Sequence, residues 1–161
     1  MTMSGLRENA CATQSLTWEN HAWSDWCLLD TAIAGQAPDT AGLYRLRCRG
    51  QDGLIYIGET GRSLKKRLRQ LRAAMENVKR GKPPGAPHVA GGCVLAHEQS
   101  GFVIEVSWVE NPELDPRNRR GVECELIAAY RKAMGGTNPT CQFGGHFVRT
   151  SGLEAIRRRC P

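Results

Sequence analysis

The chain has no apolar run that approaches the roughly 20 residues needed to cross a membrane. Its first residues also lack the apolar stretch of a secretory signal peptide. Both absences predict a protein that neither spans a membrane nor is exported by that route. Aromatic residues make up only 6% of the 161 residues, while 40% are hydrophobic and 24% are charged. This length and balance are typical of one globular domain.

Closely spaced cysteine pairs are absent as well. The seven cysteines are an odd number without a repeated spacing, so at least one stays unpaired in a monomer. The nearest approaches to a metal cluster are His88 with Cys93 and Cys141 with His146, and neither has the spacing of a structural zinc site. This usage predicts a reducing, cytoplasmic setting and does not favour a zinc site.

Positive charge is concentrated in one part of the chain. Residues 1–41 carry one Arg against five acidic residues, a net charge of −4, whereas residues 42–82 carry twelve Lys or Arg against three acidic residues, a net charge of +9. Such a density is typical of a surface that binds phosphates, because neutralising them releases counterions. A solvated helix face is the alternative, and charge alone does not decide between the two.

Hydrophobic patterning predicts three strands. Apolar and polar residues roughly alternate over 42–49, a turn covers 50–53 and a second strand follows at 54–58, which together predict a hairpin. A third strand is expected over 101–110. With helices between and after these strands, the pattern predicts an α+β fold with a small, mainly antiparallel sheet.

Two helices are expected to pack on this sheet. Ser63 can cap a helix that runs to about Arg80, and the run after it is a loop through Gly92. The apolar residues of this helix recur at steps of four and three, namely Leu64, Leu68, Leu71, Met75 and Val78. A second helix is expected from near Pro116 to Met134, where two glycines end it.

The predicted organisation has three parts. Residues 1–40 form an N-terminal extension, which packs on the domain because its three tryptophans are too apolar for a disordered tail. Residues 41–147 form the domain itself. Residues 148–161 are expected to be a basic C-terminal tail.

Projection at about 100° per residue separates the basic residues of the first predicted helix. Its apolar stripe spans roughly 80°, and Arg67 lies about 20° beyond the edge, where it can reach under the helix toward the hairpin. Lys65, Lys66 and Arg69 point well away, toward solvent or a ligand backbone. The alternative for Arg67 is a flanking residue that extends its charge to solvent.

The second predicted helix carries a carboxylate on its apolar side. Glu123 projects between Tyr130 and Met134, whereas Glu125 projects outside the apolar arc. A buried carboxylate is costly unless it is paired, hydrogen-bonded or bound to a metal. Glu123 therefore needs a partner, which is either an Arg such as Arg67 or a divalent cation such as Mg²⁺ or Mn²⁺.

Four elements in this order resemble the GIY-YIG nuclease superfamily. They are Gly42-Leu43-Tyr44, Tyr56-Ile57-Gly58, an Arg shortly after the second motif, and a Glu in the run ECELI. The resemblance covers about residues 41–145. It implies a three-stranded sheet packed between helices and an endonuclease that hydrolyses DNA phosphodiester bonds, leaving 5′-phosphate and 3′-hydroxyl ends.

The resemblance also implies a role for each motif residue. Tyr44, the general base, and Tyr56 would lie side by side, Arg67 would face them, and Glu123 would bind a single Mg²⁺ or Mn²⁺. The step from Tyr56 to Arg67 is one residue longer than in many members, where an Arg would stand at the position of Lys66. The helix projection also favours Arg67.

Four further residues are candidates for supporting such a site. Gly58 would let the chain pass closely at the end of the strand. The family's late polar residue, usually Asn, best matches Gln142, with Asn138 as the second candidate. His88 lies in a loop that resembles one found in small stand-alone members; no role is assigned to it, because a lone His in a loop is usually polar surface.

The expected partner is DNA, held by basic residues on and before the first helix, which are Arg62, Lys65, Lys66, Arg69 and Arg72. Little of the chain is left for a separate DNA-reading domain, so specificity is expected to be low, structure-directed, or supplied by a homo-oligomer or a protein partner. Two other functions stay open: a nucleic-acid-binding module on the same scaffold that does not cut, and a partner-binding protein that uses the tryptophan-rich N-terminus.

Overall fold

The computed structural model describes residues 3–83 and 85–142, which form an α+β fold around an open antiparallel sheet. The strand order is β1-β4-β2-β3. These strands are β1 (Cys27–Leu28), β4 (Ile104–Glu110), β2 (Gly42–Cys48) and β3 (Tyr56–Thr60). The predicted tail at 148–161, with the end of the predicted domain, lies outside the described residues.

The sheet has four strands where three were expected. The predicted hairpin is β2 and β3, which pair antiparallel with Tyr44 opposite Gly58. β4 is the expected third strand and pairs with the other side of β2. The additional strand, β1, pairs Cys27 with Val106 and Leu28 with Glu105. Two residues are too few to show an alternating pattern, so the sequence does not indicate this strand.

Five α-helices surround the sheet within the described residues. They are α1 (Met3–Thr13), α2 (Leu29–Thr31), α3 (Leu64–Lys79), α4 (Gly91–Gln99) and α5 (Pro116–Ala133), with a 3₁₀ turn η1 (Trp18–Asn20) and a π-helical turn η2 (Ala32–Gln36). Both long helices were predicted. The Ser63 hydroxyl caps α3 by accepting a hydrogen bond from the Lys66 backbone N–H, and Asp115 caps α5.

Helices α1 and α4 were not predicted. Helix α4 begins with two glycines and is buried over most of its surface, so it has no polar face that would produce a helical period. Helix α1 is mostly polar, and Ala10 and Thr13 are its buried residues among those described. Their formation depends on what they pack against.

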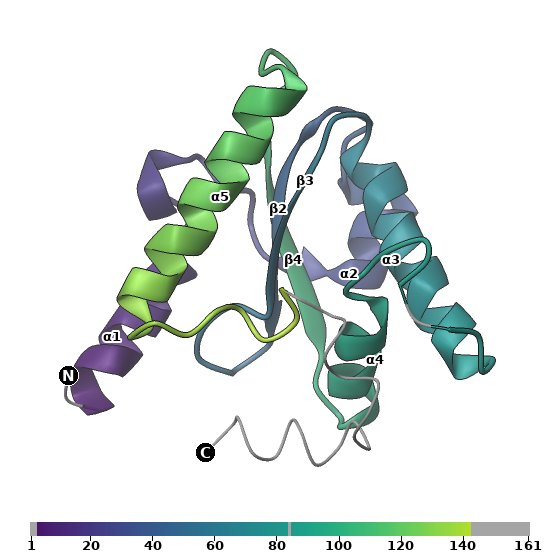
Figure 1. The fold of residues 1–161 in the computed structure, drawn as a ribbon, viewed down its shortest axis with the longest axis horizontal. Coiled ribbons are helices and arrows are strands. Elements are labelled where there is room, and N and C mark those ends of the chain that lie inside the picture. The colour runs from purple at the N-terminus through teal and green to yellow at the C-terminus, as the bar shows by residue number, and fades with distance from the viewer. Residues whose placement is uncertain (1–2, 84, 143–161) are drawn as a thin grey trace.

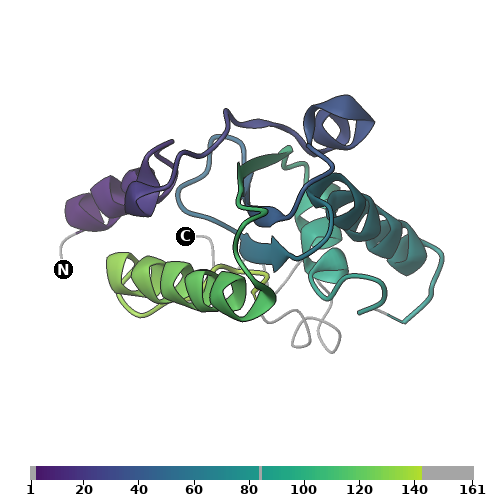
Figure 2. The ribbon, with the colours of Figure 1, turned by 90° about the horizontal axis from the view of Figure 1, so that it is seen from above.

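The side chains of β2 point alternately to two layers of helices. Tyr44, Leu46 and Cys48 face a core with α3 and α4, while Leu43 faces a core built from α5 and two tryptophans. Figure 1 shows β2 and β3 running between α5 on one side and α3 on the other, and Figure 2 shows the same arrangement from above. No helix in the described part of the chain is long and apolar enough to cross a membrane.

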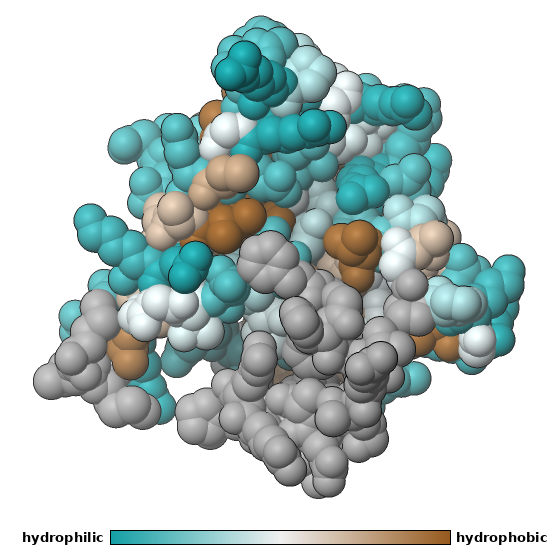
Figure 3. Space-filling view, viewed as in Figure 1, coloured by the Kyte–Doolittle hydropathy of each residue, from teal (hydrophilic) through white to brown (hydrophobic). Residues whose placement is uncertain are grey.

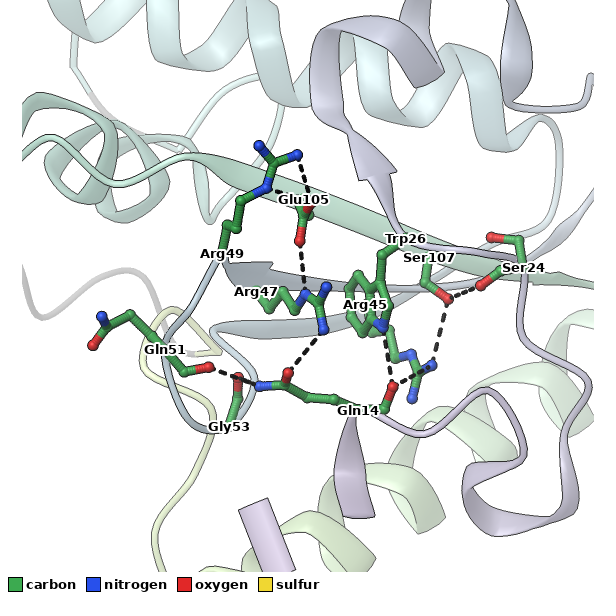
Figure 4. Close-up of polar contacts among 10 residues, drawn as sticks. All are labelled: Gln14, Ser24, Trp26, Arg45, Arg47, Arg49, Gln51, Gly53, Glu105 and Ser107. Carbon is green, nitrogen blue, oxygen red and sulfur yellow. Dashed lines mark hydrogen bonds and ion pairs between the residues drawn. The ribbon is translucent and has the colours of Figure 1, made fainter. Parts of the chain in front are cut away.

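Arg45 on β2 is buried among aromatic rings (Figure 4). Its guanidinium carbon lies 4.2 Å from the ring centroid of Trp23 and 4.7 Å from that of Trp26. The same group donates hydrogen bonds to the carbonyls of Thr13 (2.7 Å) and Ser15 (2.9 Å). These contacts attach the tryptophan-rich chain between α1 and β1 to the sheet.

Gln14 makes a second connection from this segment. Its amide nitrogen donates to the carbonyls of Gln51 (2.9 Å) and Gly53 (2.8 Å), and its amide oxygen accepts from Arg47 (2.9 Å), as Figure 4 shows. Glu105 on β4 accepts from both Arg47 and Arg49 at 2.8 Å. The end of α1 is thereby tied to the β2–β3 turn.

Replacing Arg45 with Met should lower the free energy of unfolding by about 2–4 kcal/mol, because the buried Thr13 carbonyl and the part-buried Ser15 carbonyl lose their donor and the tryptophans lose a cation–π partner. Urea unfolding followed by tryptophan fluorescence measures the change. The exposed Arg69→Met is the matched control and should stay within about 0.5 kcal/mol of the wild type. Equal stability of the two variants would contradict this account of Arg45.

Candidate functional site

The two tyrosines of the sequence motifs lie together on the face of the sheet that α3 covers. Tyr44 pairs with Gly58 across the hairpin and Tyr56 pairs with Leu46, so the tyrosines are diagonal neighbours on one face. Their ring centroids are 5.9 Å apart, and both side chains are buried. The hairpin therefore brings together the two tyrosines that the sequence places 12 residues apart.

Gly58 makes this close approach of the rings possible. A Cβ at this position would lie 2.6 Å from the Tyr56 ring and 2.7 Å from both Cζ and Oη of Tyr44. Neither ring can move freely, since both are packed in the core. Gly58 thus permits the observed position of the Tyr44 hydroxyl, because any side chain there would displace it.

His88 adds a third ring to the two tyrosines. It was expected to be polar surface, but it is buried, with its centroid 5.3 Å from the Tyr56 ring and 6.2 Å from the Tyr44 ring. Its Nε2 lies 2.6 Å from Tyr44 Oη. The loop after α3 folds back over the hairpin, and one residue in a loop without periodicity gives no sequence signal of this burial.

The other His88 nitrogen determines how this hydrogen bond is polarised. The backbone N–H of Ala90 donates to His88 Nδ1 at 3.2 Å, so Nδ1 carries no proton. The neutral ring then has its proton on Nε2 and donates it to Tyr44 Oη. Burial, and after it the charge of Arg67, lower the pKa of His88 to about 3, so the ring is neutral at physiological pH.

The positive charge of Arg67 acts on each of the other site residues. It lies half-buried in the first turn of α3, and its Nη1 donates to Gln70 Oε1 at 3.1 Å. Burial raises the pKa of both tyrosines and of Glu123, and the positive charge of Arg67 opposes this rise in all three. Its Nε is buried without a hydrogen bond among the described residues. The structure therefore places Arg67 beside the tyrosines, as the helix projection predicts.

Glu123 approaches from α5, on the other face of the sheet. Its side chain is half-buried, and burial, with the nearby negative charge of Glu59, raises the pKa of its carboxyl group. A hydrogen bond from the Glu59 backbone, and after it the charges of Arg67 and Arg120, act in the opposite direction. Glu59 itself lies 3.8 Å from both Arg119 and Arg120. The surroundings of Glu123 thus disfavour its ionised form on balance, and a cation bound to the carboxylate would favour that form.

The groups meet because β3 is an edge strand. Tyr56 and Gly58 face α3, while Glu59 faces the other way, toward α5. No further strand among the described residues pairs with the outer side of β3, so Glu123 can act on Tyr56 around that edge. Figure 1 shows this edge between α3 and α5, and the same view in Figure 3 shows mainly hydrophilic residues in its upper part, where the first turns of both helices lie.

The two candidates for the late polar residue differ in their contacts. The Gln142 amide accepts a hydrogen bond from the Ile57 N–H (3.0 Å) and donates one to the Ile57 carbonyl (2.8 Å). These bonds satisfy backbone groups of Ile57 on the free edge of β3. Gln142 therefore helps to position the strand that carries Tyr56. Within the described residues, no contact joins Asn138 to the tyrosines, and its Oδ1 is buried without a hydrogen bond.

The basic residues of the predicted DNA-binding surface divide into two groups. Arg62, Lys66 and Arg69 are exposed and Lys65 is half-buried. Arg72 instead forms ion pairs with Asp30 and Glu98, both at 2.7 Å, so its charge is already compensated. The spacing of Arg72 on the helix could not reveal these partners, because they lie on α2 and α4.

Comparison of the chain with family models, with curated proteins and with solved structures finds no match in any of the three. The function must therefore be argued from the site itself. The site joins two buried tyrosines, a buried neutral His, a shared Arg and an under-compensated carboxylate, and buried groups with displaced pKa values are typical of functional sites.

Replacing Gly58 with Ala should lower the free energy of unfolding by about 1–3 kcal/mol, because the methyl group must push apart two packed rings. Guanidinium unfolding measures the loss. Gly35→Ala is the matched control, since nothing lies within 4 Å of a Cβ there. A stability for Gly58→Ala equal to that of this control would show that the tyrosine rings are not held as described.

Proposed function

We propose that this protein is a metal-dependent endonuclease of the GIY-YIG type, which hydrolyses DNA phosphodiester bonds and leaves 5′-phosphate and 3′-hydroxyl ends. The observation that carries the proposal is the convergence of Tyr44, Tyr56, Arg67 and Glu123 at the edge of β3. These are the four residues that the sequence motifs single out, and they come from four separate elements. A purely structural role for each would not require them to influence one another's protonation.

The donor set at Glu123 fits a single Mg²⁺ or Mn²⁺. Carboxylate oxygen is the preferred ligand of these ions, and Mg²⁺ commonly binds one or two carboxylates while its remaining positions hold water or substrate phosphate. Glu123 would hold the ion, with Glu59 adding negative charge nearby. When bound, the ion would stabilise negative charge on the departing oxygen.

The other residues would act on the phosphate and on the attacking water. Arg67 would bind the non-bridging oxygens, since its guanidinium supplies paired donors for phosphate. Tyr44 would take a proton from the water, and Tyr56 would orient the water or the phosphate through its hydroxyl. His88 Nε2–H, which points at Tyr44 Oη, would donate a hydrogen bond to the tyrosinate.

The main energetic obstacle is the protonation of Tyr44. Burial raises its pKa well above the ordinary value of 10.0, Tyr56 adds to this, and Arg67 lowers it by less than burial raises it. Arg67 alone therefore does not make Tyr44 a ready base at neutral pH. The bound cation and the His88 donor would have to stabilise the tyrosinate, which agrees with a strict metal requirement.

DNA would approach over the basic residues that form no ion pair with another described residue. Arg62, Lys66 and Arg69 are exposed on the turn before α3 and along its outer surface. Their charge is suited to backbone phosphates rather than to base edges, which agrees with low sequence specificity. The compensated Arg72 is left out of this surface.

A second function, a nucleic-acid-binding module that does not cut, is favoured by one observation. The Tyr44 side chain is fully buried, at 0% exposure, so water reaches its hydroxyl only if neighbouring groups move. The third alternative, partner binding through the tryptophans, has less support because Trp18 and Trp23 are buried around Arg45.

The wild-type protein should nick supercoiled plasmid with Mg²⁺ or Mn²⁺ and stop when EDTA is added. Glu123→Gln should lose about 10²–10³-fold in cleavage rate because it loses the metal ligand. Tyr44→Phe should lose about 10²–10⁴-fold because it loses the base. Gel assays of cleavage and of salt-dependent DNA binding, run in parallel, distinguish loss of chemistry from loss of affinity.

Two matched variants control these results. Glu125→Gln, which removes an exposed carboxylate from the same helix, and Tyr130→Phe, which removes a hydroxyl that bonds the Leu54 backbone, should both keep wild-type cleavage. DNA binding without cleavage by the wild type would instead support the binding module. Full activity of Tyr44→Phe would remove the tyrosine base from the mechanism.

The cleavage rate should rise with pH between pH 7 and 9. The competent form of Tyr44 is deprotonated, and burial raises the pKa of its hydroxyl, so the competent fraction grows as the pH increases. Single-turnover cleavage at saturating protein measures this, with DNA binding determined at each pH as a control. A flat profile while the chemical step limits the rate would exclude the tyrosine as base.

A further inference from the structure

Three side chains suited to zinc meet between α4 and the loop that follows α5. Cys93 and His97 lie one turn apart on α4, and Cys141 comes from the loop. One ligand atom from each lies within 4.8 Å of the others, and all three residues are buried. In the structure the two cysteines form a disulfide, with their Cα atoms 5.5 Å apart. The pairs suggested by the sequence were different, since His88 contacts Tyr44 and His146 lies outside the described residues.

The disulfide does not explain why the His97 ring is buried without hydrogen bonds. Its side chain is buried, at 2% exposure, and neither ring nitrogen has a hydrogen-bond partner among the described residues. Buried polar groups of this kind are nearly always satisfied by a protein group, a water or an ion. A metal ion next to the two sulfur atoms would satisfy one of these nitrogens, and the i,i+4 spacing on α4 brings His97 and Cys93 to the same face.

We propose that Cys93, His97 and Cys141 bind one Zn²⁺ when the two cysteines are reduced. Two thiolates and an imidazole bind Zn²⁺ in preference to Mg²⁺ or Ca²⁺. A water molecule can complete the tetrahedral coordination. With Zn–S bonds of about 2.3 Å and Zn–N bonds of about 2.0 Å, tetrahedral ligand atoms lie about 3.5–3.8 Å apart. The three ligand atoms are already within reach of this arrangement, and the bonded sulfurs need only separate by side-chain rotation.

The disulfide and the zinc site exclude each other, because zinc requires thiolates. Reduction by a thiol or phosphine reductant delivers two electrons and two protons, and the S–S bond becomes two thiols. Binding of Zn²⁺ then releases the two thiol protons to solvent. The metal-bound form belongs to the reducing setting that the cysteine content predicts, and the disulfide form to an oxidising one.

Either form would hold the loop against the free edge of β3. The backbone N–H of Cys141 donates to the Ile55 carbonyl at 2.7 Å, and the adjacent Gln142 makes both hydrogen bonds to Ile57. The zinc site therefore lies next to the hydrogen bonds that support β3, the strand that carries Tyr56. The proposal does not depend on nuclease activity, and its test involves no DNA.

The test uses the full chain, reduced with a phosphine, freed of metal and titrated with Zn²⁺ and then with Co²⁺ as a spectroscopic probe. We expect one equivalent of metal per chain and the strong near-ultraviolet absorption of a Co²⁺–thiolate centre. Zinc should also raise the unfolding temperature of the reduced protein. Cys93→Ser, Cys141→Ser and His97→Gln should each lose the stoichiometric site.

Cys124→Ser and His21→Asn serve as controls, because Cys124 is an exposed free cysteine and His21 lies outside the cluster. Both should bind one equivalent. If a ligand variant fails to fold, alkylation of the wild type answers the question: zinc should protect Cys93 and Cys141 but not the exposed Cys11 and Cys124. A reduced wild type that binds no zinc, or that binds it without protecting these two cysteines, would overturn the proposal.

Discussion

Strand β2 is hydrogen-bonded on both sides, to β3 and to β4, and its register determines the face that each of its side chains occupies. Tyr44 faces the core under α3, and Arg45 faces the tryptophans. A slip of one residue would exchange the two faces, placing a guanidinium in the α3 core and a tyrosine against the tryptophans. Because misplaced side chains on both faces would raise the free energy of the fold, this register is strongly specified. The register in turn sets the positions of the site residues on the hairpin.

The edge strand β3 is the second organising feature, because it exposes one row of backbone groups to the outer side of the sheet. An open edge is usually blocked by charge, by distortion or by a covering segment. Here the loop after α5 covers part of it through Cys141 and Gln142. The remainder is the place where Glu123 from one face and Arg67 from the other come within electrostatic range.

The surroundings of Arg45 differ from those of the candidate site. Burial and the charge of Arg47 lower the pKa of Arg45 to about 9, but aromatic rings and backbone carbonyls bind its guanidinium, which is the pattern of a structural residue. Glu123 and Tyr44 are held in surroundings that oppose their ionised forms. Buried groups with displaced pKa values are typical of functional sites, which agrees with the proposed ligand and reaction at this place.

The sequence by itself determined the elements whose signals are local: the hairpin, α3 with its Ser63 cap, and α5 from Pro116 to the two glycines that follow it. Projection of these helices was also sufficient to select Arg67 and Glu123, because the face of a regular helix follows from its period. Only the tertiary structure decided the burial of His88, the partners of Arg72, the formation of α4 and β1, and the meeting of Cys93, His97 and Cys141. These features join segments that are distant in the chain and carry no periodicity of their own, so they exist only once the sheet and its helices have packed.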